Sequence, residues 1–360
     1  MTMLDPAALP EEPAPLRAAR EARLSALISR CDPWFKVLGL AWLTPLWRML
    51  AGENPKGQLG DLWRLAIVPM LAILGFLALW AVLAPKVVTS LGAIPGPAQV
   101  WEQVGVLHAD AVAEREKEAA FYAKQAEKNA ALIAEGKADE VKDRPYTGKP
   151  TYYQQILTSI QTVFFGFLLA TLVAVPLGIL SGMSATANAA INPLVQIFKP
   201  VSPLAWLPIV TMVVSALYAG DGSKSFVISA VTVTLCSLWP TLINTALGVA
   251  SIDKDLVNVG RVLKLTTWTR ITRLVLPSAL PLIFTGLRLS LGVGWMVLIA
   301  AEMLAQNPGL GKFVWDEFQN GSSDSLARIM VAVFTIGIIG FLLDRVMFAL
   351  QQAFTFSGKR

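Results

Sequence analysis

The residues best suited to chemistry form a charged, helix-forming island at 249–280. It contains five bases and two acids, which are Lys254, Arg261, Lys264, Arg270, Arg273, Asp253 and Asp255. Charges of this kind form ion pairs with another protein surface, and none of them suggests catalysis. Long apolar runs stand on both sides of the island and indicate membrane spans. We therefore interpret the island as the place where a second protein holds a membrane protein.

Other sets of chemistry-bearing residues are missing from the sequence. His108 is the only histidine and stands in a charged loop, while Cys31 precedes the first apolar run and Cys236 lies inside another. A disulfide is therefore not expected, and the lack of a Cys/His cluster argues against a zinc or haem site. No Gly-x-x-x-x-Gly-Lys-[Ser/Thr] motif for binding phosphate occurs either. We expect a chain that is not an enzyme and that binds no metal or cofactor itself.

The composition is that of a polytopic membrane protein. Of 360 residues, 54% are hydrophobic and only 15% are charged, against roughly 25% in an average soluble domain. The mean hydropathy is +0.56. The net charge of +5 is small, and basic cytosolic loops explain it better than a nucleic-acid partner does.

Six apolar runs are long enough to cross about 30 Å of hydrocarbon. They are residues 65–84, 157–180, 191–218, 225–247, 282–305 and 328–349. The third run is too long for a straight helix and contains Pro200, Pro203 and Pro208. We expect a short helix at the membrane surface, a kink, and then the span proper. The last five spans form a core at 157–350.

Residues 1–60 form an N-terminal segment with an interfacial helix at about 34–50, broken near Pro45. Lys36 and Arg48 leave too few apolar residues between them to cross the hydrocarbon, and the tryptophans of this stretch favour the membrane boundary. A helix packed on the other spans fits the same residues equally well.

Short loops orient the chain through the positive-inside rule. The 249–280 loop is basic and the tail at 351–360 ends in two bases, whereas the loops at 219–224 and 306–327 hold Asp221, Asp316, Glu317 and Asp324 with few bases. We therefore expect the 249–280 loop and both termini in the cytosol.

The loop at 85–156 then lies on the outer side. Its residues 109–143 are rich in Ala, Glu and Lys and show no wide apolar stripe, which predicts a solvated helix. This helix is either a surface insertion without a function or a docking element for an external partner.

The first half of the 249–280 island predicts a short helix from Asp253 to Lys264, with three apolar residues on one face. Those residues are Leu256, Val259 and Leu263.

A second short helix begins at a cap from Thr266 or Thr267 and runs to about Val275. Pro277 and Pro281 then mark the start of the fifth span. Two such helices at the membrane surface can transmit force as a rigid lever. An ordinary amphipathic connection is the alternative.

This segment resembles the signature cytosolic loop of bacterial ABC importer permeases, the EAA loop. The family pattern is Glu-Ala-Ala, three residues, Gly, nine residues, Ile, one residue and Leu-Pro. The matching positions are held, in that order, by Asn258-Val259-Gly260, Lys264, Leu274 and Leu276-Pro277. The register and the Leu-Pro end agree with the pattern, whereas the polar head departs from it.

Further motifs resemble the permeases of the nitrate, cyanate and bicarbonate branch. They are NVGRVLKL in the island, VLPSALPLIFTGLRLSLGVGWMVLIAAEML after it, KPVSPLAWLP at 199–208, PGLGKFVWDEFQN, and GFLLDRV at 340–346. Sulfonate and taurine permeases are close relatives with similar motifs. The resemblance covers about 150–350, more than half of the chain.

The resemblance implies an all-α membrane protein with the six transmembrane helices of the type I ABC importer permease fold. Two copies would form one pathway in the bacterial inner membrane, beneath an external substrate-binding protein. Two cytosolic ATPase subunits would bind ATP and Mg and drive alternating access. Nitrate is the expected cargo, with a sulfonate or taurine permease as one alternative and an ion-coupled secondary transporter as another.

Coupling to the ATPase subunits would then fall on eight residues of the loop. They are Asp253, Asp255, Asn258, Gly260, Arg261, Lys264, Arg273 and Pro277.

A small anion that crosses hydrocarbon must exchange its hydration shell for dipoles or positive charge. The candidates near the spans are Lys199, Ser202, Thr211, Arg288, Ser290, Trp295 and Glu302. Lys199 and Arg288 either form an electropositive mouth or snorkel to the headgroups. Glu302 is either a gate residue or part of a structural hydrogen bond between helices. Asp344 and Arg345 are expected to pair with each other or to snorkel.

Overall fold

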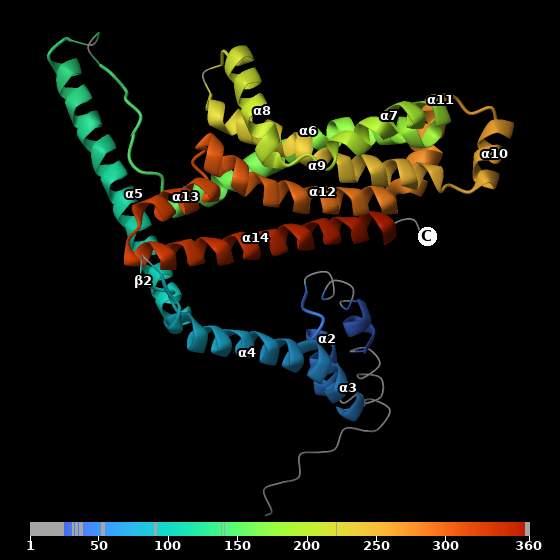
Figure 1. The fold of residues 1–360 in the computed structure, drawn as a ribbon, viewed down its shortest axis with the longest axis horizontal. Helices are drawn as coiled ribbons and strands as arrows, with labels where there is room; N and C mark the ends of the chain where they lie inside the picture. Colours follow the sequence, from blue (N-terminus) through green and yellow to red (C-terminus); the bar gives the residue numbers. More distant parts are fainter. Residues whose placement is uncertain are drawn as a thin grey trace, which may run out of the picture. The chain divides into compact units, whose positions relative to one another are not determined.

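The computed structural model describes residues 25–30, 32, 35, 39–51, 55–89, 92–137, 139, 141–220 and 222–356 (Figure 1). The chain forms two compact units. The first comprises Met1–Leu79 with Phe348–Ala353, and the second comprises Trp80–Met347 with Phe354–Arg360.

The first unit contains α2 (Leu43–Leu50) and α3 (Pro55–Leu62). Of the helix expected at 34–50, Trp34 and Lys36 lie outside the described residues. Pro45 is the third residue of α2 and lies in the first turn, where a helix needs no backbone donor, so α2 continues through this proline instead of breaking there.

A π-helical turn (Trp63–Ile67) joins α3 to α4 (Val68–Leu83). Together these elements make a continuous apolar helix from Lys56 to Lys86, which is long enough to cross a membrane. Its most apolar stretch has a mean hydropathy of 2.5, which is typical of a membrane span. The π turn ends just before Pro69, which lacks the N–H that a regular α turn would use.

The second unit contains the remaining spans. They are α6 (Tyr152–Met183), the pair α7 (Ala185–Phe198) and α8 (Pro203–Leu217), α9 (Lys224–Ala250), α12 (Leu276–Ala305) and α14 (Ser323–Phe356). In the described part of the chain, five helices are long and apolar enough to span, or six if α7 and α8 count as one broken span. The sequence-based expectation of an all-α, six-span fold is confirmed.

The broken span bends sharply between α7 and α8, by 103°. Pro203 occupies the first turn of α8, and the side chain of Ser202 caps that turn by accepting from the backbone N–H of Leu204. The bend falls where the sequence predicts it, because Pro200 and Pro203 cannot donate to a continuous helical ladder.

Close packing of α9 between α6 and α12 forms the centre of this unit. Gly166 of α6 faces the backbone of α9, where a Cβ atom would lie 2.7 Å from the carbonyl oxygen of Ala230. Gly286 of α12 approaches α9 in the same manner near Pro240. Small residues at these contacts let the helices approach as membrane helices commonly do.

The helix α5 (Pro97–Ala134) follows a short hairpin of β1 (Val88–Thr89) and β2 (Gly92–Ala93). It begins earlier and ends earlier than the expected 109–143. The chain reverses at Gly136, whose φ of +76° stops the helix.

Beyond this reversal, the segment 141–150 returns along α5 without regular structure of its own. We call α5 and this segment the arm.

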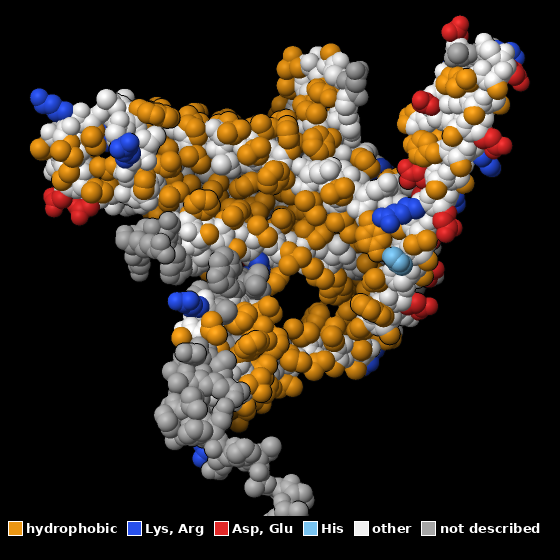
Figure 2. Space-filling view, turned by 180° about the vertical axis from the view of Figure 1, so that it is seen from behind, with side chains coloured by type: hydrophobic (Ala, Val, Ile, Leu, Met, Phe, Trp, Pro, Cys, Tyr) orange, Lys and Arg blue, Asp and Glu red, His pale blue; other side chains and the backbone are white. Residues whose placement is uncertain are grey.

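Figure 1 shows how the second unit is arranged. The helices α10 (Lys254–Val262) and α11 (Thr267–Arg270) lie at one end of the spans, and α5 crosses the other end near α13 (Leu310–Asn320). We call these the loop end and the arm end. In Figure 2, apolar side chains cover the middle of the spans, while charged side chains gather at the loop end and along the arm. This distribution is what a membrane-spanning body requires.

Candidate functional site

The two short helices of the 249–280 loop begin with side-chain caps. Asp253 accepts from the backbone N–H of Asp255 at 2.9 Å and so starts α10. Thr266 accepts from the backbone N–H of Thr269 at 3.3 Å and starts α11. Both caps satisfy donors that a helix leaves free in its first turn.

Lys264 ends α10 in a conformation that glycine usually supplies. Its φ is +49°, and the backbone N–H of Leu265 donates back to the carbonyl of Gly260 at 3.1 Å. This is the 6→1 hydrogen bond of a Schellman motif, with Lys264 at the left-handed position. The same residue takes the Gly place of the EAA pattern. Lys264 therefore adopts the left-handed conformation that a glycine at this place would adopt easily.

The second loop helix does not stop at Val275 as the sequence predicted. It continues through a π turn (Ile271–Val275) into α12, so that Thr267–Ala305 form one helix of 39 residues. Pro277 lies just after the π turn, which absorbs its missing donor without breaking the helix. Consequently α11 is the end of a span, and a push on α11 is delivered directly to α12.

Apolar side chains of the loop are exposed to an unusual degree. Val262 is 81% exposed and Trp268 is 74% exposed, and three neighbouring side chains are exposed to a smaller extent: Leu256, Val259 and Leu263. An apolar patch at the polar end of a membrane protein is typical of a protein–protein interface.

The charged coupling candidates surround this patch. Asp253, Asp255, Lys264 and Arg273 are exposed, and the described side chains form no ion pair with them. The side chain of Arg261 lies outside the described residues, Asn258 and Pro277 are exposed, and Gly260 is buried beside Leu274. Of the eight coupling candidates, six therefore expose described side chains at the loop end.

A hollow of about 410 Å³ separates the loop from the spans. Its walls come from the ends of α6 and α9 and from the loop, and are Gly182, Met183, Val249, Ala250, Ile252, Val257, Asn258, Arg270, Leu274 and Val275. The hollow thus lies between the loop and the ends of two spans.

The pathway candidates are not gathered at one place. Lys199 and Ser202 are exposed at the bend between α7 and α8, and Thr211 is half-buried on α8. Arg288 pairs with Asp344, to which its Nε and Nη2 both donate, the latter at 2.7 Å. This bidentate pair ties α12 to α14 at half-buried positions. Asp344 also lies 3.6 Å from Arg345, the partner that the sequence suggested.

The other candidates on α12 bond neighbouring helices. Ser290 lies 2.7 Å from the Thr241 hydroxyl of α9, and the indole Nε1 of Trp295 donates to the carbonyl of Ile336 of α14 at 3.0 Å. Both side chains are buried. In this conformation they join α12 to α9 and α14.

Glu302 lies at the arm end in a tight polar clamp. Its carboxylate accepts from Ser159 Oγ of α6 at 2.8 Å and from the backbone N–H of Gly311 at 2.9 Å. Ser159 Oγ in turn accepts from the backbone N–H of Leu310 at 2.9 Å. Gly309 has no room for a side chain, since a Cβ atom there would lie 2.2 Å from the carboxylate. The clamp fastens α13 to α6 and α12, which is the structural alternative that the sequence left open.

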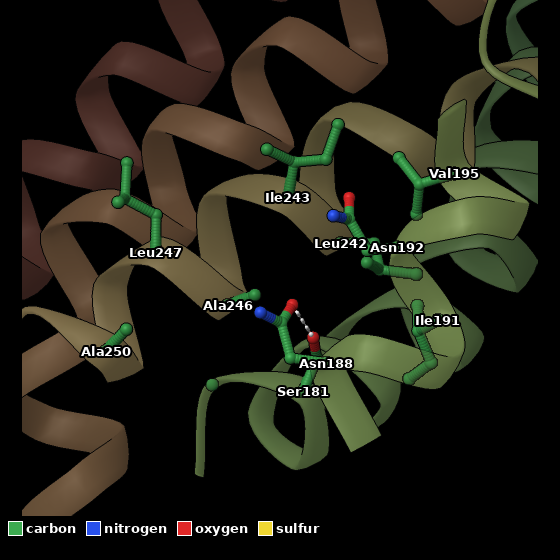
Figure 3. A pocket seen from close by; sticks show the side chains of 11 residues that line it. Ser181, Asn188, Ile191, Asn192, Val195, Leu242, Ile243, Ala246, Leu247 and Ala250 are labelled. Atoms are coloured by element: carbon green, nitrogen blue, oxygen red, sulfur yellow. Dashed lines mark hydrogen bonds between the residues drawn. The ribbon is translucent and has the colours of Figure 1, made fainter. Parts of the chain in front are cut away.

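Sequence reasoning missed one polar set on α7. Asn188 and Asn192 line a pocket at the loop end, next to Ser181 (Figure 3). The signal was their spacing of four residues, which puts two carboxamides on one face of a short helix that also leads to Lys199.

Comparison with known proteins gives four findings. Residues 174–356 match the family model described as binding-protein-dependent transport system inner membrane component. The chain is similar to the nitrate import permease protein NrtB of Synechococcus elongatus, with 39% identity over 193 residues. That match covers 54% of this chain and 66% of NrtB.

The bicarbonate transport system permease protein CmpB of the same species is 34% identical over 306 residues, which cover 84% of this chain and 94% of CmpB. The fold is similar to that of a chain of the MetNI methionine ABC transporter in an inward-facing conformation. The TM-score is 0.50 at 15% identity, covering 57% of this chain and 96% of the other.

Proposed function

This chain belongs to the family of binding-protein-dependent transport system inner membrane components, the permease subunits of ABC importers, and we propose that its cargo is nitrate or a closely related small anion. Nitrite, cyanate and bicarbonate are the related ions, and a sulfonate or taurine permease is the alternative. The similarity to NrtB and CmpB supports this choice.

One structural observation supports the proposal that ATP-driven motion reaches the spans through the 249–280 loop. The 249–280 loop exposes an apolar patch. Its exposed Asp253, Asp255, Lys264 and Arg273 form no ion pair with another described side chain. The second helix of the loop continues as span α12. Two ATPase subunits bind this surface on two copies of the chain, and they alone bind ATP and Mg. The eight coupling residues transmit the closure of the ATPase pair to the pore, and none of them is catalytic.

The transport cycle follows from this division of labour. ATP binding turns the pore toward an external binding protein, which delivers the anion, and hydrolysis returns the pore to the cytosol. In this arrangement the chain lies in the bacterial inner membrane with the loop end and both termini in the cytosol. The arm end then faces the binding protein.

The test is nitrate uptake into vesicles that contain the permease, its ATPase subunits and its binding protein. We expect uptake that requires internal ATP, and no ATP hydrolysis by the purified chain alone. Competition by nitrite, cyanate, bicarbonate and taurine ranks the cargoes. Robust ATPase activity of the chain without partners would overturn the proposal.

Collapsing the ion gradients while ATP is maintained distinguishes an ABC importer from an ion-coupled secondary transporter. An ABC importer keeps its uptake, whereas an ion-coupled secondary transporter stops.

A further inference from the structure

A pocket of about 250 Å³ lies at the loop end, between α6, α7 and α9 (Figure 3). Most of its wall is apolar. The lining residues are Ser181, Gly182, Asn188, Ile191, Asn192, Val195, Leu242, Ile243, Ala246, Leu247 and Ala250. None of these lining side chains is charged, although the pocket lies at the charged loop end.

The polar groups of this pocket present donors to it. Ser181 Oγ donates to Asn188 Oδ1 at 3.0 Å, which occupies the carboxamide oxygen and leaves the NH₂ group available. Asn192 stands one helical turn further along α7, and Figure 3 shows both carboxamides directed into the space between α7 and α9. The pocket therefore combines amide N–H donors with an apolar wall.

This combination suits a small, weakly hydrated anion. Amide hydrogens replace part of its hydration shell, while the absence of a carboxylate avoids repulsion. The absence of a lysine or arginine avoids tight binding, and a transported ion must also leave. A cation would instead require several oxygen ligands, whereas the side chains of this pocket supply only the Ser181 hydroxyl and two carboxamide oxygens, of which that of Asn188 already accepts from Ser181.

The rest of α7 continues the same chemistry. Asn188, Asn192, Val195 and Lys199 recur at intervals of four, three and four residues, which places them on one face of the helix. Asn188, Asn192 and Val195 line the pocket, and Lys199 stands at the bend where α7 gives way to α8. Broken spans of this kind usually border a cavity or a transport path, because irregular backbone is not tolerated against lipid.

We propose that Asn188 and Asn192 form a transient binding station for a small monovalent oxyanion on its way to the cytosol. The station deepens the proposed function, on which it rests, by assigning cargo contacts to α7. Gly182 and Ala250 line both this pocket and the 410 Å³ hollow beneath the 249–280 loop. Movement of the loop on ATP binding therefore reshapes the station, which couples release of the anion to the cycle.

The test compares import by three double variants in vesicles with the complete transporter. Asn188→Asp with Asn192→Asp keeps the side-chain shape but replaces donors by negative charge. We expect nitrate import to fall by about tenfold or more, while ATP hydrolysis stimulated by the binding protein persists. Asn188→Ala with Asn192→Ala removes the donors without adding charge and should lower import less, by about three- to tenfold.

The third variant, Asn188→Gln with Asn192→Gln, keeps both donors and should import within about threefold of the unmodified protein. Gln319→Glu with Asn320→Asp, which adds the same two negative charges at exposed positions of α13, is the matched control and should import normally.

Co-purification with the ATPase subunits confirms assembly of each variant. Import by the unmodified transporter tests the proposed function by itself in the same vesicles. If the aspartate or alanine variants import at its rate, the station is wrong while the proposed function stands.

Discussion

The 249–280 loop and the arm are both polar and charged, yet they treat their charges in opposite ways. In the loop, the exposed carboxylates and bases form no ion pair with described side chains, and the apolar side chains between them face solvent. In the arm, side chains of α5 form hydrogen bonds with Asp143, Arg144, Tyr146 and Lys149 of the returning segment. This difference is the one expected between a surface that binds a partner and a structure whose polar groups bond to one another.

The arm is fastened along its whole length. Glu114 accepts from Tyr146 Oη at 2.8 Å and from the backbone N–H of Lys149 at 3.1 Å. Nearer the tip, Asp143 accepts from the side chains of Gln125 and Asn129. These bonds hold the segment 141–150 in an extended path that has no strand or helix to stabilise it.

The base of the arm is fastened as well. Arg328 of α14 donates to Gln103 and Asp110 of α5 and lies 3.5 Å from Glu317 of α13. Val100, Leu107 and Phe313 pack beneath it in an apolar cluster. The arm is thus bonded to α14 and packed against α13, whereas the loop is continuous with α12. A docking role for the arm stays a prediction.

The largest expected effect is on the loop. Leu263→Asp with Trp268→Asp puts two charges into the exposed apolar patch. We expect association with the ATPase subunits to weaken by about a hundredfold, because interface patches lose roughly 1–3 kcal/mol for each central apolar contact removed. Co-purification and ATP-driven uptake measure it.

The matched control places the same change on the arm. Val112→Asp with Ile133→Asp also replaces two exposed apolar side chains of a helix. Association with the ATPase subunits should be unchanged. If both variants lost the same amount of ATPase-subunit association, the loop and the arm could not be distinguished as binding surfaces.

The next effect concerns the base of the arm. Arg328→Ala removes three polar contacts at a side chain that is only 24% exposed. Hydrogen bonds to charged groups contribute about 1.5–3 kcal/mol, so we expect α5 to open locally with faster amide hydrogen exchange. Assembly with the ATPase subunits should remain normal. Exchange in α5 as slow as in the unmodified protein would show that the apolar cluster alone holds the arm.

The spans and the loop could be predicted from the sequence because their signals are local. Apolar runs of sufficient length indicate helices wherever they stand, and Pro200 with Pro203 forces the bend at its observed place. The cap at Thr266 is equally local. The continuity of α11 with α12 escaped prediction, because a π turn that absorbs Pro277 leaves no sequence signal that is distinct from a helix end.

The partners of the charged residues in the spans could not be predicted. Glu302 bonds Ser159, 143 residues earlier, and Arg288 bonds Asp344, 56 residues later. Such pairs depend on which helices lie side by side, and a single sequence does not specify that. Asn188 was missed for a different reason, since an amide within an apolar helix changes neither charge nor helical pattern.

A smaller effect is expected at Lys264, where the loop carries strain that the arm avoids. A residue with a side chain costs about 1 kcal/mol in the left-handed region relative to glycine, so Lys264→Gly should stabilise the end of α10 by about that amount. The matched change in the arm, Gly136→Lys at φ +76°, should destabilise it by a similar amount. Thermal unfolding of the two variants checks the opposite signs, and shifts of the same sign would contradict the assignment.

The smallest expected effect is the pH dependence of the arm. Hydrogen bonds from Tyr146 and Lys117 hold the pKa of the Glu114 carboxyl below its ordinary value of 4.5, and the pKa of Tyr146 is raised by the same contact. A lowered folded-state pKa contributes stability that is present above the ordinary value and is lost as pH falls through the folded one.

Hydrogen exchange at the Lys149 amide should therefore lose protection relative to the α5 amides only below about pH 4.5. Glu114→Gln should remove this step. Loss of protection at the same pH in the Glu114→Gln variant would assign the step to another carboxylate and make the two regions more alike than their contacts indicate.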